Sequence, residues 1–392
     1  MSAKNSAALF KAAFQTIVIG LFLINFSASS FLQSAETSDI AITDASKVYG
    51  SDEFVPVKFD RKGQYKGSRV YFDLDEDGNF ELLTFPFLYK PWKDSLDVAQ
   101  KKRTDIKAYK LSPEGRPTEI EILVMNRVET CVHPRKSLVA DFNGDKKQDI
   151  FVICHGYDMA PFPGEKNILL KNFGSSSFEI RSPIDLKGYF HAGAAGDIDM
   201  DGDIDIVLAN TDVQDNFNKR NTKLTVHLND GTGRFEITTK SLPKKLGNLG
   251  PNGVWSLELF DVNSDGAPDL FIGGDQLTKS KSAVYLNDGT GSFENKNSIK
   301  IPNIAKYETV YDAVYFENSI YILRLHNDKK SYKIQSFDIK SLKAELLHSE
   351  EYSHRKGWLD WLYLYQSEEN VFLISDVQDT PNAVSPITIK IK

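Results

Sequence analysis

The sequence has little sulfur and no large excess of one charge. Its 392 residues include only two cysteines and four methionines, and 47 basic residues stand against 54 acidic ones, for a formal net charge of −7. We therefore expect no general attraction for nucleic acid or anionic lipid, and the cysteines form no Cys/His cluster with zinc spacing. Because Phe (25) and Tyr (16) far outnumber Met, the composition favours a strand-rich core. An apolar content of 41% excludes a wholly disordered chain.

Long apolar runs are also scarce, and the one that occurs lies near the N-terminus. Lys4 and Lys11 precede the apolar residues 16–26, and small residues follow at 27–30. This order is typical of a secretory signal peptide, and the run is shorter than the ~20 residues that span a bilayer. We predict a signal peptide over residues 1–30, a linker over 31–50 and a secreted, periplasmic or cell-surface protein whose mature chain does not insert into a membrane. Export permits a disulfide between Cys131 and Cys154, although two separately buried thiols fit the sequence equally well.

Four acidic segments repeat one pattern along the chain. They begin at Asp73, Asp141, Asp197 and Asp261, with oxygen-bearing side chains at positions 1, 3, 5 and 9 and, in three copies, Gly at position 6. In the second copy Lys146 replaces this Gly, so that loop departs from the pattern in geometry and charge. The first and third segments carry four carboxylates at these positions and the others carry three, so we expect the first and third to bind a cation most tightly.

The spacing suits a hard cation. Ca²⁺ takes six to eight oxygen ligands at about 2.3–2.6 Å, and alternate residues of a tightly curled loop point inward. An acidic surface turn is the alternative, since Asp, Asn and Gly are common turn residues, but four copies in register argue against it. The expected ligands of up to four Ca²⁺ ions, counting position 7 through its backbone carbonyl, are Asp73, Asp75, Asp77, Asn79, Glu81, Asp141, Asn143, Asp145, Lys147, Asp149, Asp197, Asp199, Asp201, Asp203, Asp205, Asp261, Asn263, Asp265, Ala267 and Asp269.

The residues after each loop decide between calcium motifs. An EF-hand requires flanking helices and a bidentate Glu at position 12, whereas position 12 here is Thr84, Val152, Leu208 or Ile272 and each loop runs into a strand-like sequence. Dockerin repeats also place helices there. The segments instead resemble the FG-GAP/VCBS repeat family, whose calcium-loop β-propeller repeats also occur in integrin α heads. This resemblance covers about residues 68–295 and implies a propeller with calcium loops.

The strand rhythm extends this reading to the C-terminus. Turn sequences such as Asn229–Gly233 and Asn287–Gly291 favour hairpins, and counting gives five units of four strands and a last unit of three. The strand-like segment 53–59 supplies a partner for the last unit, which would leave no large exposed edge. We therefore predict an all-β, six-bladed β-propeller over residues 51–392, with seven blades as the alternative, calcium loops in blades 1–4 and metal-free blades 5 and 6.

The long connections indicate where a ligand would bind. The calcium loops and Gly-rich turns share one face, so the long connections share the other, and long loops carry binding residues disproportionately. Aromatic rings with a few polar groups suit a sugar or peptide. The candidate ligand-binding residues on that face are Trp92, His155, Tyr157, Asp158, Tyr189, His191 and Asp212, together with His133.

Three functions remain open from sequence. We favour a calcium-stabilised module that binds a carbohydrate or protein. The alternatives are an extracellular polysaccharide lyase or hydrolase that uses the group of His155, Asp158 and His191, and a cell-surface adhesion subunit. The sequence contains no nucleophile elbow, P-loop or HExxH motif, so catalysis is the less favoured hypothesis.

Overall fold

The structure is a computed structural model that describes residues 55, 57, 59, 67–90, 93–126, 129–213, 220–238, 241–242, 249, 253–274, 282–293, 298–326, 331–351, 362–366, 370–375 and 387–390. The chain separates into two compact units, residues 1–34 and 35–392, and all described residues belong to the second. The predicted signal peptide, the predicted linker and most of segment 53–59 lie outside the described residues.

The first three sheets follow one another along the chain. The first contains β1 (Gly67–Phe72), β2 (Glu81–Pro86), β3 (Lys107–Leu111) and β4 (Pro117–Ile120) in that order. The second contains β6 (Pro134–Ala140), β7 (Asp149–Cys154), β9 (Ile168–Gly174) and β10 (Ser177–Arg181), with β5 (Leu123–Val124) added in parallel at the outer edge. The third contains β12 (Phe190–Gly196), β13 (Asp205–Val213), β14 (Arg220–Asn229) and β15 (Phe235–Thr238).

The remaining sheets repeat this up-and-down order. The fourth contains β16 (Ser256–Phe260), β17 (Asp269–Gly273), β18 (Ala283–Tyr285) and β19 (Ile299–Lys300). The fifth contains β20 (Thr309–Phe316), β21 (Ser319–Leu325), β22 (Ser331–Asp338) and β23 (Lys343–Glu351). The last pairs only β24 (Leu362–Gln366), β25 (Asn370–Ser375) and β26 (Ile387–Lys390). A short helix, α2 (Leu96–Gln100), and a ribbon of β8 (Glu165–Lys166) with β11 (Lys187–Gly188) lie in the connections.

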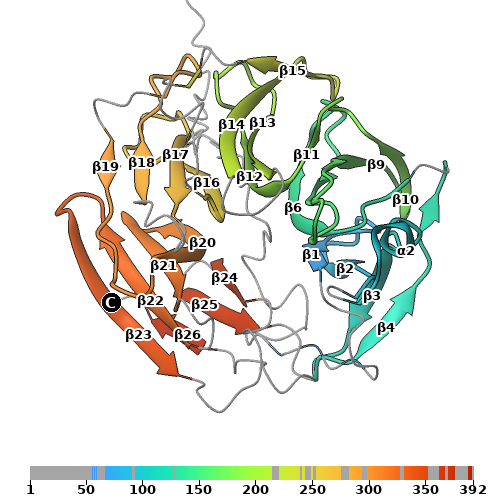
Figure 1. Cartoon of the computed structure of the whole chain (residues 1–392), viewed down its shortest axis with the longest axis horizontal. Coiled ribbons are helices and arrows are strands. Elements are labelled where there is room, and N and C mark those ends of the chain that lie inside the picture. Colours follow the sequence, from blue (N-terminus) through green and yellow to red (C-terminus); the bar gives the residue numbers. More distant parts are fainter. Residues whose placement is uncertain are drawn as a thin grey trace, which may run out of the picture. The chain divides into compact units, whose positions relative to one another are not determined.

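The second unit is built as a ring of these sheets (Figure 1). The first strand of each sheet contacts the first strand of the next, from β1 through β6, β12, β16 and β20 to β24. The last sheet returns to the first, because the guanidinium of Arg69 on β1 lies over the ring of Tyr363 on β24, 5.3 Å from its centroid. This is the arrangement of a β-propeller, in which the first strands surround a central channel.

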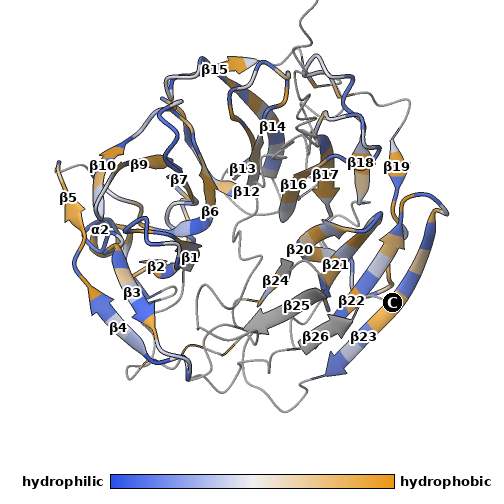
Figure 2. Ribbon diagram, turned by 180° about the vertical axis from the view of Figure 1, so that it is seen from behind, coloured by the Kyte–Doolittle hydropathy of each residue, from blue (hydrophilic) through white to orange (hydrophobic). Residues whose placement is uncertain are grey.

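Burial explains why these sequences form blades. The inner strands β1, β2, β7, β12 and β17 are buried along their whole length, whereas the outer strand β23 is largely exposed. Figure 2 shows the same contrast, with hydrophobic residues dominating β16 and β17 and alternating with polar ones along β23. Hydrophobic clusters form between successive sheets: Val70 and Ile150 share one, and Leu323 and Leu364 share another. Each blade therefore buries its two faces against its two neighbours.

The all-β propeller class predicted from sequence is confirmed. The described residues form five complete blades, which differs from the expected six or seven. The reason is that the last unit pairs three strands, and the segment expected to complete it is described only at Val55, Val57 and Phe59.

Cys131 and Cys154 form a disulfide, with Cα atoms 5.6 Å apart, which decides between the two alternatives left open by the sequence. Beside it, the partly buried Glu165 carboxylate accepts backbone N–H bonds from Val132 and His133 at 2.8 and 3.0 Å, and from Gly156 at 2.9 Å. The bridge and this carboxylate therefore fasten the start of β6 to the end of β7.

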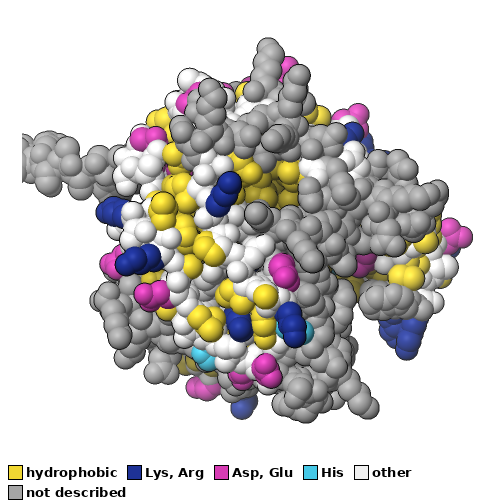
Figure 3. All heavy atoms as spheres, turned by 60° about the vertical axis from the view of Figure 1, so that its left-hand side comes forward, with side chains coloured by type: hydrophobic (Ala, Val, Ile, Leu, Met, Phe, Trp, Pro, Cys, Tyr) yellow, Lys and Arg dark blue, Asp and Glu magenta, His cyan; other side chains and the backbone are white. Residues whose placement is uncertain are grey.

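The surface shows charges of both signs. In Figure 3, Lys and Arg side chains lie interspersed with Asp and Glu, with hydrophobic patches between them. Within the described part of the chain, none of the helices has the length and apolar character needed to cross a membrane.

Candidate functional site

The four acidic loops share one internal construction. The side chain at position 9 is buried in each, and it accepts the backbone N–H of position 2 in the same loop: Leu74 to Glu81 (3.0 Å), Phe142 to Asp149 (3.2 Å), Ile198 to Asp205 (2.9 Å) and Val262 to Asp269 (3.1 Å). In the second, third and fourth blades its other oxygen accepts an Asn N–H at the end of the third strand, at 2.8 Å each time. The side chain at position 9 therefore fastens the loop to its blade through hydrogen bonds alone.

Positions 1, 5 and 6 shape the curl. The position-1 carboxylate accepts the N–H of position 6, as Asp197 does from Gly202 at 3.0 Å and Asp141 does from Lys146 at 2.7 Å. Position 5 accepts the N–H of position 7, so Asn79, Lys147, Asp203 and Ala267 all take part through their backbone. Lys146 has a left-handed φ of 68°, comparable to 97° at Gly202, so the second loop keeps the curl at some cost in strain.

The third loop fits a metal ion. Carboxylate oxygens of Asp197, Asp199 and Asp205 lie within 4.8 Å of one another. Within the described residues, no donor reaches the buried Oδ1 atoms of Asp197 and Asp199. Burial raises the pKa of Asp205 to about 7 and also raises the pKa values of Asp197 and Asp199. Buried, unpartnered carboxylate oxygens are the donors that a hard cation takes, so this cluster could hold a metal ion.

The first loop holds a similar group with a lysine beside it. Asp73, Asp75 and Glu81 bring carboxylate oxygens within 4.8 Å of one another. The ammonium of Lys110, on β3, lies 2.9 Å from Asp75 and 3.5 Å from Glu81. This cluster could also hold a metal ion, but the positively charged Lys110 ammonium already lies next to its carboxylates.

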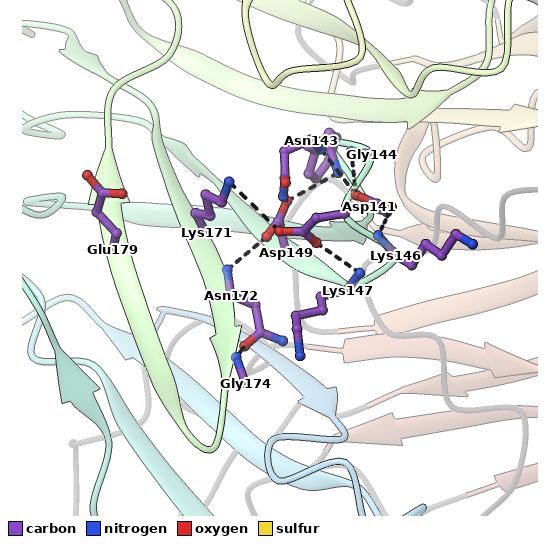
Figure 4. Close-up of polar contacts among 12 residues, drawn as sticks. Asp141, Asn143, Gly144, Lys146, Lys147, Asp149, Lys171, Asn172, Gly174 and Glu179 are labelled. Atoms are coloured by element: carbon purple, nitrogen blue, oxygen red, sulfur yellow. Dashed lines mark hydrogen bonds and ion pairs between the residues drawn. The ribbon is translucent and has the colours of Figure 1, made fainter.

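The second and fourth loops use Asn side chains to close on themselves. In the second loop the Asn143 amide donates to Asp149 at 2.5 Å (Figure 4). The Lys147 ammonium points out of this loop and contacts Glu76 of the first loop at 2.6 Å. In the fourth loop the Asn263 amide donates to Asp265 at 2.7 Å.

Five of the residues predicted for the opposite face, His155, Tyr157, Asp158, Tyr189 and His191, lie close together and are bonded within the protein. His155 and His191 lie with their Nε2 atoms 3.2 Å apart, and the ring of His155 lies 3.6 Å from that of Tyr189, centroid to centroid. The Tyr189 hydroxyl donates to Asp158, and the Tyr157 hydroxyl donates to the Asp94 carbonyl at 2.7 Å. Both imidazoles and both phenol rings are buried.

The charge state of this cluster follows from its burial. Burial lowers the pKa of His155 well below its usual value and that of the neighbouring His133 to about 3. The imidazoles of His133 and His155 are therefore neutral. Trp92 and the side chain of Asp212 lie outside the described residues, so ligand binding by the predicted set stays a prediction.

A pocket opens at the mouth of the channel, on the face opposite the acidic loops. It is lined by residues from the beginnings of the first strands, where the chain enters each blade from that face: Arg135, Lys136, His191, Trp255, Ser256, Glu258, Tyr311, Asp312 and Tyr363. Of these residues, only His191 belonged to the predicted set. The pocket has about 30 Å³ of space for the centre of a water molecule, which is room for roughly two waters.

The pocket has an aromatic rim and a charged floor. Trp255, Tyr311 and Tyr363 are partly exposed, and the guanidinium of Arg135 lies 4.9 Å from the centroid of the Trp255 ring. Below them, the buried Lys136 ammonium contacts both oxygens of the buried Glu258, at 2.9 and 3.1 Å. Glu258 also accepts a bond from the Ser256 hydroxyl at 2.9 Å.

Asp312 lies buried in the same floor. It accepts the backbone N–H of Leu364 at 2.7 Å and that of Ala313 at 2.9 Å. Burial, followed by the charge of Glu258, raises the pKa of Asp312 to about 7. Burial also raises the pKa of Glu258, against the opposing charge of Lys136. The floor therefore holds two buried carboxyl groups beside the Lys136 ammonium, and the pKa values of both carboxyl groups are raised.

Sequence reasoning missed this floor because its residues are far apart in the chain, with 122 positions between Lys136 and Glu258. The available signal was a charged residue inside an otherwise apolar first strand, as at Arg69, Lys136, Glu258 and Asp312. A charge in a strand that is buried along its length needs a partner, and in a propeller the first strands supply it across the channel.

Comparison with known proteins supports the reading of the acidic loops. A family profile described as FG-GAP-like repeat matches residues 141–208 and 197–272, which contain the second, third and fourth loops. Residues 141–272 therefore carry FG-GAP-like repeats. No curated protein matches the sequence.

Solved structures resemble this chain only distantly. An exo-β-1,3-galactanase from Phanerochaete chrysosporium has 8% identity and a TM-score of 0.41, and the match covers 65% of this chain and 58% of that one. A GH43_1 enzyme from Xanthomonas citri has 12% identity and a TM-score of 0.41, with 61% and 80% covered. A rhamnogalacturonan lyase from Bacillus licheniformis has 15% identity and a TM-score of 0.38, with 79% and 55% covered.

Proposed function

We propose that this protein is an exported, calcium-binding propeller that binds a carbohydrate at the channel mouth, on the face opposite its acidic loops. The observation that supports this most is the composition of the pocket, where Trp255, Tyr311 and Tyr363 surround a floor of Lys136, Glu258 and Asp312. The disulfide between Cys131 and Cys154 agrees with export.

The rim offers flat contact surfaces. The ring centroids of Trp255 and Tyr311 lie 6.5 Å apart and their planes differ by 35°, while His191 lies 5.8 Å from Trp255. Partly exposed aromatic rings give contact area to the apolar faces of a sugar at little cost in side-chain entropy. Because the pocket has room for only about two waters, we infer that a polar group at the end of a glycan reaches the floor while the sugar rings lie against the rim.

The floor offers both kinds of hydrogen-bonding group. An ammonium donates to sugar hydroxyl oxygens, and carboxylates accept from hydroxyl groups, so together they fix the orientation of a polyhydroxylated ligand. A purely apolar ligand would cover these polar groups without adding a hydrogen bond to them, which costs free energy.

Calcium has a structural role in this proposal. The third loop supplies unpartnered buried oxygens, and its charge repulsion would be relieved by a divalent cation. The loops lie at the opposite ends of the strands from the pocket, so the ion stabilises the blade and does not contact the ligand.

The test is a binding screen of calcium-loaded protein against a glycan array and a set of soluble polysaccharides in affinity gels. We expect retention on at least one glycan, and roughly a tenfold weaker affinity after Trp255→Ala. Phe173→Ala is the matched control, since Phe173 is an exposed ring outside the pocket (47% accessible). Absence of glycan binding, or equal binding by Trp255→Ala, would refute the proposal, and Trp255-dependent capture of a protein would favour an adhesion subunit instead.

A polysaccharide lyase or hydrolase is the second candidate, and one observation favours it. Asp312, whose pKa is raised to about 7, and Glu258, which pairs with Lys136, place two carboxyl groups in different environments in one pocket, and such a pair is what general acid–base chemistry uses. Release of reducing ends from a bound polysaccharide, abolished by Asp312→Asn with binding retained, would establish this function. Unchanged product formation by that variant would exclude Asp312 as the acid.

A further inference from the structure

The residue at the position of Lys110 is charged in some of the first four blades and uncharged in others. On β2 and β3, Leu82 pairs with Tyr109, so Lys110 is the residue that follows toward the acidic loop. The same register places Lys171 in the second blade, Leu228 in the third and Leu286 in the fourth. A cationic side chain therefore faces the first two loops, and an uncharged one faces the third and fourth.

The Lys110 ammonium lies among the proposed ligands of the first loop. Its Nζ is 2.9 Å from Asp75 Oδ2, 3.5 Å from Asp77 Oδ2 and 3.5 Å from Glu81 Oε1. These carboxylates are at positions 3, 5 and 9, which are the positions that would coordinate the ion. An ammonium at this distance from three ligand oxygens and a bound Ca²⁺ at 2.3–2.6 Å from the same oxygens would repel each other strongly.

Lys171 stands farther from its loop. Its Nζ is 3.8 Å from Asp145 Oδ2, and the second loop is held together by the Asn143 amide instead. The close insertion of an ammonium is therefore a property of the first blade, whose loop has as many carboxylates as the third.

We propose that Lys110 is a built-in cation of the first loop, so that the third loop takes up Ca²⁺ first and the first loop only at higher concentration, after Lys110 has been displaced. This inference rests on the proposed calcium binding and adds an order of loading to it. Equal carboxylate counts in the two loops would otherwise lead to similar affinities. The third loop has Leu228 where the first has Lys110, so no side-chain ammonium from that position competes for its oxygens.

The experiment compares calcium titrations of metal-free wild type, Lys110→Leu, Lys107→Leu and Asp197→Ala by isothermal calorimetry, with thermal unfolding measured in chelator. Leu is chosen because blades three and four carry it at this position. Lys107→Leu is the matched control, since Lys107 lies on the same strand and pairs with Glu119 at 2.8 Å, away from the loop.

We expect Lys110→Leu to bind calcium at the first loop with about tenfold higher affinity than wild type. Adding Asp73→Ala to this variant should remove the increase. In chelator the Lys110→Leu protein should melt at a lower temperature than wild type, because the loop carboxylates lose their cation. Lys107→Leu should bind calcium as wild type does.

The outcomes separate the two proposals. Identical isotherms for wild type and Lys110→Leu, with binding lost in Asp197→Ala, would overturn the loading order and leave calcium binding intact. A failure of wild type and Lys110→Leu alike to bind calcium would overturn both. If the wild type binds no calcium and Lys110→Leu does, the result would support the role of Lys110 and refute calcium binding at the third loop.

Discussion

The side-chain amide of Asn229 donates a hydrogen bond to the backbone carbonyl of Phe142, 2.9 Å away in the preceding blade. Asn287 repeats the relationship one blade later, donating to the carbonyl of Ile198 at 2.8 Å. Both carbonyls belong to position 2 of an acidic loop. The Gly-rich turn of one blade therefore holds the acidic loop of the blade before it, and the loops on this face are mechanically connected.

Asn229→Ala should destabilise the protein by about 2–4 kcal/mol, because it leaves the carbonyls of Phe142 and Ile204 without their amide donor. Urea unfolding measures this loss. Thr232→Ala in the same turn is the control: its exposed hydroxyl bonds only to Asp230 among the described contacts, and we expect a change within about 0.5 kcal/mol. Equal effects of the two substitutions would show that the bond between blades adds nothing.

Lys146→Gly should stabilise the second loop by about 0.5–1 kcal/mol, since it relieves a left-handed backbone that the other three loops assign to Gly. The reciprocal change, Gly202→Ala, should destabilise by about 1 kcal/mol through backbone strain alone, because a Cβ at Gly202 meets no atom within 4 Å. Chemical denaturation of both variants checks this pair, and a destabilising Lys146→Gly would contradict it.

Asp312 should make stability fall as pH rises from about 4 to 7. Its folded pKa of about 7 lies above the usual 3.8, so between these values the folded protein holds a proton that the unfolded chain releases, and the stability is present at the lower pH and lost at the higher one. The groups that face it are Glu258 and Lys136. Because the buried His133 and His155 act in the opposite direction, the test is the difference in unfolding free energy between wild type and Asp312→Asn across this range.

The unfolding free energy of wild type minus that of Asp312→Asn should fall by roughly 1–4 kcal/mol between pH 4 and pH 7. A difference that stays constant with pH would mean that Asp312 ionises as an ordinary carboxylate.

Replacing both cysteines of the disulfide with Ser should destabilise the protein by about 2–4 kcal/mol. The bridge joins residues that precede β6 and end β7, so the unfolded chain gains freedom when it is removed. Urea unfolding of wild type with and without reductant should give the same loss. An unchanged midpoint would show that Glu165 alone holds the two strands together.

Local features of the fold could be predicted from sequence, and features that depend on register could not. The acidic loops and their following strands are set by residues within nine positions, so Asp197 and Asp205 were identified with their partners. Lys110 reaches the first loop only through the pairing of β2 with β3, and the contact of Lys136 with Glu258 requires the closure of several blades around a channel. Sequence likewise does not reveal that His155 and His191 bond to each other.

We propose that the acidic loops bind calcium and that the stability of the propeller depends on it. Thermal unfolding of the wild-type protein in millimolar Ca²⁺ and in excess chelator tests this most directly, with Asp197→Ala measured beside it. We expect the chelator to lower the melting temperature by several degrees, since a ligand at ~100 times its Kd stabilises by about 2.7 kcal/mol, and we expect Asp197→Ala to lose most of this response. The same melting temperature in both buffers would contradict it.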